Sequence, residues 1–119
     1  GEALVFQYLL VQYPRATVTW INKDVESMAY YDIKVEEHAS DGSERIKTTF
    51  VEVKSSRFDA LNLFEISPNE WAFASGTPPV NYDVYRVYNA GDVNSVYLHI
   101  VRNLLNAVTE QKVRLCLAI

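Results

Sequence analysis

Two acids and a lysine stand at spacings that suit acid–base or metal chemistry. Glu52 and Lys54 lie two positions apart in the run Thr49–Ser55 (TFVEVKS). The alternation of this run predicts a strand, in which residues i and i+2 point to the same face. Glu52 and Lys54 should therefore stand side by side, while Val51 and Val53 face the other way. A half-buried acid and amine cost desolvation free energy unless they are paired or used in function.

Asp32 is the second acid, and a predicted hairpin brings it close to Glu52. Tyr30–Glu37 alternates like a strand, and the polar loop His38–Arg45 contains an Asp-Gly turn, which predicts antiparallel pairing with the Glu52 strand. The register that places Asp32 opposite Glu52, with Cβ atoms about 4.5–5.5 Å apart, also gathers four branched apolar side chains on the other face. These are Ile33, Val35, Val51 and Val53.

Two facing carboxylates repel each other, so this arrangement predicts a positive group between them. Lys54, Lys34 and a divalent metal ion are the candidates. A lattice of salt bridges on a solvated face, made by both acids and both lysines, is the alternative. Mg²⁺ prefers oxygen ligands, and Asp32, Glu52 and the Val53 carbonyl could supply three. Lys54 could then orient a metal-activated water and stabilise charge on a phosphate.

Length and composition limit the remaining choices. The 119 residues predict a single domain, 1–119, with one core. The chain does not start with Met, so we expect a piece of a larger parent protein. It contains no apolar run long enough to span a membrane. A net charge of −4 argues against a broad nucleic-acid surface but leaves room for a local basic patch.

The cysteine content bears on location. Cys116 is the single cysteine, and it lies in an apolar run, so we expect a small core residue. One cysteine excludes an internal disulfide and is compatible with a reducing compartment. We therefore expect an intracellular location, the nucleus included.

The order of predicted elements indicates an α/β (α+β) domain with a central mixed sheet flanked by helices.

The segment Ser67-Pro68-Asn69-Glu70 has the N-cap, the first-turn proline and the glutamate of a capping box. We therefore expect Glu70 mainly to close that cap. Arg57 is a candidate phosphate contact or a plain surface charge, and Arg86 is a candidate phosphate contact. We expect helices over 2–13, 67–75 and 103–109, and strands over 17–21, 30–37, 49–54, 82–88, 96–101 and 112–118.

Several motifs along the chain resemble one known family. They are Gly1-Glu2, Val18–Asn22 (VTWIN), Tyr31–Ile33 (YDI), Phe50–Lys54 (FVEVK), Ile66–Ala74 (ISPNEWAFA) and Tyr85–Tyr88 (YRVY). On these residues the chain resembles the PD-(D/E)xK, or restriction-endonuclease-like, superfamily. Within it, the chain is most similar to the C-terminal domain family of the plant protein NO VEIN. This resemblance implies that the chain is the C-terminal part of a larger protein.

The resemblance implies a fold, a cofactor and roles for particular residues. It implies a restriction-endonuclease-like core with Asp32, Glu52 and Lys54 at the catalytic positions. Asp32, Glu52 and Val53 would bind Mg²⁺ or Mn²⁺, and Glu2 would be the further helical acid seen in some members. The proline that often precedes the first aspartate is absent, and Tyr31 stands in its place.

The expected function is metal-dependent hydrolysis of phosphodiester bonds, with DNA as the nucleic-acid partner. The alternative is a catalytically silent module that keeps this fold and serves nucleic-acid or protein interaction within a larger protein.

Overall fold

The computed structural model describes residues 1–21, 30–39, 45–56 and 63–116. Five strands form one sheet in the order β1-β2-β3-β4-β5. β3 and β4 are parallel, and the other neighbouring pairs are antiparallel, so the predicted mixed sheet with helices is confirmed. The elements are α1 (Glu2–Gln12), β1 (Thr17–Trp20), β2 (Ile33–His38), β3 (Ile46–Ser55), α2 (Pro68–Ala74), β4 (Asn81–Tyr88), β5 (Tyr97–Val101) and α3 (Leu104–Thr109).

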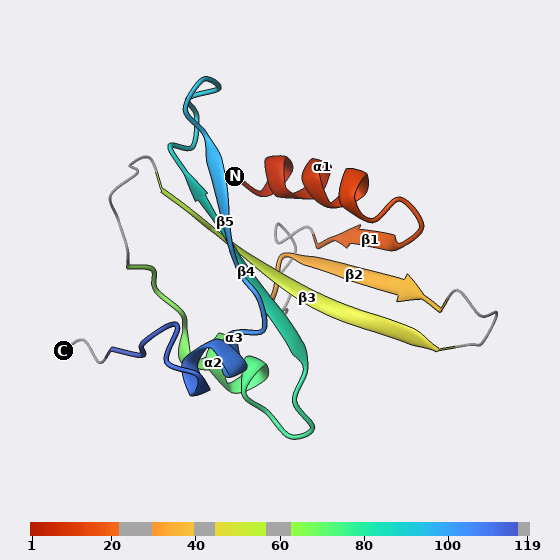
Figure 1. Ribbon diagram of the computed structural model, residues 1–119, viewed down its shortest axis with the longest axis vertical. Helices are drawn as coiled ribbons and strands as arrows, with labels where there is room; N and C mark the ends of the chain where they lie inside the picture. Colours follow the sequence, from red (N-terminus) through yellow and green to blue (C-terminus); the bar gives the residue numbers. More distant parts are fainter. Residues whose placement is uncertain (22–29, 40–44, 57–62, 117–119) are drawn as a thin grey trace.

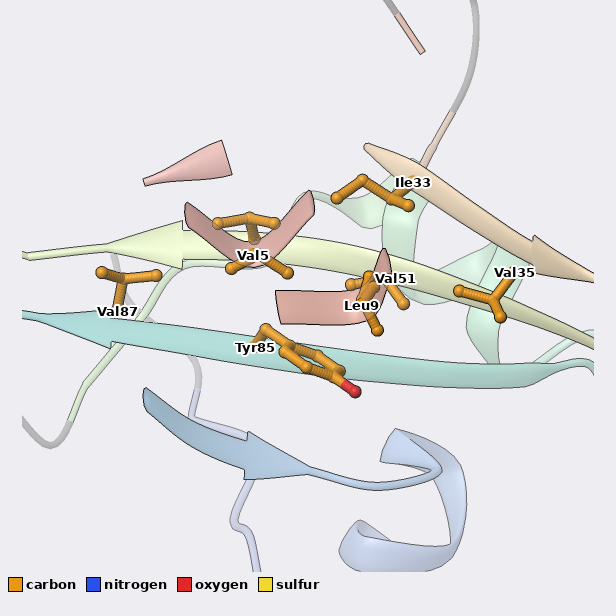
Figure 2. Packing of buried hydrophobic residues seen from close by; sticks show 8 residues of the cluster. Val5, Leu9, Ile33, Val35, Val51, Tyr85 and Val87 are labelled. Atoms are coloured by element: carbon orange, nitrogen blue, oxygen red, sulfur yellow. The ribbon is translucent and has the colours of Figure 1, made fainter. Parts of the chain in front are cut away.

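Helices cover both faces of the sheet (Figure 1). α1 packs on one face through Val5 and Leu9, which are four positions apart and so project from one side of the helix. Figure 2 shows these two side chains over the branched side chains of β2 and β3 and the Tyr85 ring of β4. α2 and α3 contribute to a second core on the opposite face.

The outer side of α1 is exposed. Only Val5 and Leu9 of this helix are buried. Leu4, Leu10 and Val11 are exposed. In the described part of the chain, no helix is long and apolar enough to cross a membrane.

The predicted pairing of β2 with β3 is confirmed. The strands are antiparallel, and Ile33 lies opposite Val51. The four branched residues predicted for the apolar face all belong to the core beneath α1. β2 begins only at Ile33, so Asp32 lies immediately before the strand, where its N–H donates to the Val51 carbonyl at 2.8 Å.

α2 lies in the connection between the parallel strands β3 and β4. Its predicted capping box is present. The Ser67 hydroxyl accepts from the Glu70 N–H at 3.0 Å, and the Glu70 carboxylate accepts from the Ser67 N–H at 2.8 Å. These bonds satisfy backbone donors that a helix start otherwise leaves free. They also fix the Glu70 side chain against the backbone.

The end of the chain contradicts two predictions. Residues 112–116 form a turn and irregular structure instead of a strand, and 117–119 lie outside the described residues. The N–H groups of Lys112 and Val113 both donate to the Ala107 carbonyl, at 2.8 and 3.2 Å, after Gln111 adopts a φ of 62°. These bonds cap α3 and turn the chain back on it. Cys116 is exposed, so it is not a core residue.

Candidate active site

Asp32 is fixed to the strand that carries the other candidate residues. Its Oδ2 accepts from the Val53 N–H at 2.7 Å. Asp32, which directly precedes β2, thus accepts a hydrogen bond from the backbone of β3. Asp32 is only 2% exposed. Asp32 is also close enough to Glu52 to raise the pKa of that residue. Asp32 and Glu52 therefore lie close to each other, as predicted.

Glu52, Lys54 and Glu70 form a contact network on the sheet face opposite α1. Lys54 Nζ lies 3.4 Å from Glu52 Oε1. It lies closer to Glu70, at 3.1 Å from Oε1 and 3.3 Å from Oε2. Glu52 is 3% exposed, and the Glu70 and Lys54 side chains are 13% and 20% exposed. The positive group beside Glu52 is thus Lys54, whereas Lys34 contacts Glu36 at 3.5 Å.

The sequence did not predict the contact between Glu70 and Lys54. The capping-box spacing correctly predicts the bonds with Ser67 but does not report the second partner of this carboxylate. Lys54 and Glu70 are 16 positions apart, on a strand and on the helix that follows it. The tertiary path of the connection brings them together, and no periodicity within either element encodes that path.

The two glutamates have opposite pKa shifts. Burial, a hydrogen bond with Glu70 and the nearby Asp32 charge raise the pKa of Glu52 to about 9. For Glu70, burial acts upward on the pKa, but hydrogen bonds with Glu52, the Ser67 N–H and Lys54 together lower it. At neutral pH the Glu52 carboxyl therefore holds a proton and donates to the Glu70 carboxylate, which is the closer ion-pair partner of Lys54.

The raised pKa of Glu52 predicts a pH dependence of stability in metal-free protein. The folded state holds this proton more tightly than the unfolded state, so stability should fall as pH rises between about 5 and 9, by at most about 1.4 kcal/mol per pH unit. Urea unfolding at pH 6, 7 and 8 measures it. The Glu52→Gln variant, whose amide imitates the neutral carboxyl, should show a flatter dependence, and equal slopes in both proteins would contradict the assignment.

The oxygen atoms at this place are of the kinds that hard cations bind. An extended residue directs its N–H and C=O to the same edge of the strand. Since the Val53 N–H points to Asp32, the Val53 carbonyl faces the same side. The Asp32 carboxylate, the Glu52 carboxyl after loss of its proton and the Val53 carbonyl are the kind of donors that Mg²⁺ binds. This cation commonly takes one or two carboxylates with waters and phosphates. Among the described residues, no three His, Cys, Asp or Glu side chains form a group that could hold a metal ion.

Glu2 is not brought to this network. Gly1, which directly precedes α1, lies close to Ser55 at the end of β3. A Cβ atom added to Gly1 would be 3.0 Å from the Ser55 Cβ. The Glu2 carboxylate nevertheless accepts from the Trp20 indole N–H at 3.1 Å. Trp20 lies opposite Ile33 in the β1–β2 ladder, on the side of the sheet that α1 covers. The role of Glu2 as a further metal ligand stays a prediction.

The two arginines differ in what the structure says of them. Arg57 lies outside the described residues. Arg86 faces Lys54 in the parallel ladder of β3 and β4 and is 4% exposed. Its guanidinium lies 4.9 Å from the centre of the Phe64 ring and 5.0 Å from that of Tyr88. Arg86 is thus a buried cation, and its contact with phosphate stays a prediction.

Comparison with known proteins places this site within a family. The family described as Protein NO VEIN, C-terminal, matches residues 1–100, which include the whole Asp32–Glu70 network. The chain belongs to the NO VEIN C-terminal family. No solved structure matches it significantly.

Two proteins of Arabidopsis thaliana are similar to this member of the NO VEIN C-terminal family. They are Protein NO VEIN-LIKE and Protein NO VEIN, each 29% identical over 76 residues, or 63% of this chain. The aligned part is 11% of the first protein and 3% of the second. The chain thus corresponds to a small part of these much longer relatives.

Proposed function

We propose that this domain hydrolyses phosphodiester bonds in DNA, with Mg²⁺ or Mn²⁺ as cofactor. The observation that carries the proposal is the 2.7 Å bond that fixes Asp32 to the Glu52-Val53-Lys54 strand, beside the Glu52 carboxyl and the Lys54 ammonium. A restriction-endonuclease-like fold is part of the proposal. It is supported by the mixed sheet with helices on both faces and by the PD-(D/E)xK spacing of the three residues.

Each residue has a role in this proposal. Asp32, Glu52 and the Val53 carbonyl hold the cation, which supplies an activated water and offsets negative charge on the phosphate. Lys54 is the most exposed member of the network, so its ammonium can reach the attacking water or a phosphate oxygen. Burial of the two acids keeps bulk water away and strengthens each electrostatic interaction.

The proposal assigns part of the DNA binding to the rest of the longer parent protein. The relatives extend far beyond the aligned part, so the rest of the parent can supply the basic surface that a net charge of −4 does not. An intracellular location, the nucleus included, gives access to DNA.

A catalytically silent interaction module is the second candidate. Asp32 and Glu52 are 2% and 3% exposed, and Lys54 contacts two carboxyl groups. A network of this kind can serve the fold alone, because a buried charge requires a partner whether or not it has a function. This candidate predicts that no residue of the network supports cleavage.

A cleavage assay with a matched pair of variants separates the candidates. Wild-type protein should cut plasmid DNA in Mg²⁺ or Mn²⁺ and stop cutting when the metal is chelated. Asp32→Asn should reduce the rate by more than the roughly 10–100-fold that loss of an outer-shell partner costs. Glu36→Gln, which changes an acid of β2 outside the network, should leave the rate unchanged. Wild-type protein that cuts no DNA, or equal rates in both variants, would contradict the proposal.

A further inference from the structure

Lys54 has a long side chain that must be held for any defined role. Its four-carbon stem is flexible, and ordering it costs side-chain entropy. The two carboxyl groups around Lys54 Nζ differ in how they can hold it. Glu70 presents both oxygens, at 3.1 and 3.3 Å, whereas Glu52 presents one at 3.4 Å. Glu70 is thus the principal contact of the ammonium.

The Glu70 carboxylate is itself fixed by the backbone. Its Oε1, which contacts Lys54, also accepts from the Ser67 N–H at 2.8 Å. One oxygen therefore joins the first turn of α2 to the ammonium of β3. A carboxylate that is held by a backbone donor cannot rotate freely, so it offers Lys54 a pre-organised position.

We propose that Glu70 is a positioning residue, which places the Lys54 ammonium for its action on the phosphate or the attacking water. This inference rests on the proposed function. It assigns to the capping residue of α2 a second task, separate from stabilising the helix. The helix cap and the position of Lys54 then depend on the same side chain.

The capping box offers a matched control. Ser67→Ala removes the hydroxyl that accepts from the Glu70 N–H and so weakens the cap without changing the Glu70 carboxylate. Glu70→Gln keeps an oxygen that can accept from the Ser67 N–H but removes the charge that holds the ammonium. The two variants thus separate helix capping from the contact with Lys54.

The first readout is the order of the Lys54 ammonium, followed by ¹⁵N NMR of the lysine side chains in metal-free protein. The Lys54 signal, assigned by its loss in Lys54→Ala, should be sharp in wild type and in Ser67→Ala. It should broaden or vanish in Glu70→Gln. A Lys54 signal that is equally sharp in Glu70→Gln would overturn the inference. If Glu70→Gln does not fold, Glu70→Asp, which withdraws the same charge by one methylene, replaces it under the same criterion.

The second readout is the division between kcat and KM in the DNA cleavage assay. Glu70→Gln should lower kcat about 10–100-fold, as loss of an outer-shell partner does, with little change in KM. Ser67→Ala should alter neither constant by more than about 2-fold, well below that loss. Equal kcat values in the two variants would also overturn the inference. A wild-type protein that cuts no DNA overturns the proposed function instead, and the ammonium signal then decides alone whether Glu70 holds Lys54.

Discussion

Lys54→Ala should lower the kcat of DNA cleavage by about 10²–10³-fold, the cost of removing one group that stabilises developing charge in an active site. Binding of Mg²⁺ should persist, because the variant keeps Asp32, Glu52 and the Val53 carbonyl. It should even become slightly tighter, since a like charge is removed from the neighbourhood of the cation. Single-turnover cleavage and a metal titration of the same preparation measure the two quantities.

The control for Lys54→Ala is Lys34→Ala. Both substitutions remove a lysine from an ion pair, but Lys34 pairs with Glu36 outside the network. Lys34→Ala should leave kcat unchanged and alter stability by no more than about 1 kcal/mol, as for exposed ion pairs. The silent-module candidate expects only instability from Lys54→Ala, since Glu70 loses its ion partner. Wild-type cleavage per folded molecule in Lys54→Ala would contradict the catalytic role.

The part of the site that local patterns encode was predictable from the sequence. Alternation in β2 and β3 determines which side chains share a face, and an even register, unlike an odd one, gathers the branched set that includes Ile33 and Val51 on the same face. That register brings Asp32 to Glu52. The capping box of α2 was equally local, because Ser67 and Glu70 are three positions apart.

The remaining features depend on tertiary structure. The Glu70–Lys54 contact requires the path of the chain from β3 through α2. Burial decides the charge of Glu52, which the residue spacing leaves open. The predicted last strand failed for a related reason, because Val113 donates to Ala107 and turns back on α3 instead of pairing with a strand. Apolar composition alone could not distinguish these outcomes.

Mg²⁺ or Mn²⁺ should raise the melting temperature of the protein. A ligand that binds only the folded state stabilises it by mass action, by about 2.7 kcal/mol at a 100-fold excess over Kd, which is of the order of 10 °C for a domain of this size. The Glu52 carboxyl must lose its proton before it can bind a cation. The increase should therefore be larger at pH 8 than at pH 6, and calorimetry with and without metal measures it.

Variants of the two acids test whether this response comes from the proposed site. Asp32→Asn and Glu52→Gln should each abolish the metal-induced increase in melting temperature, whereas Glu36→Gln should retain it. Without metal, Glu52→Gln should be as stable as wild type at pH 7 or more so, because an amide replaces a carboxyl that burial already keeps neutral. Melting temperatures that do not change in millimolar Mg²⁺ and Mn²⁺ would argue against the metal site. A response that persists in both acid variants would assign the cation to another place on the protein.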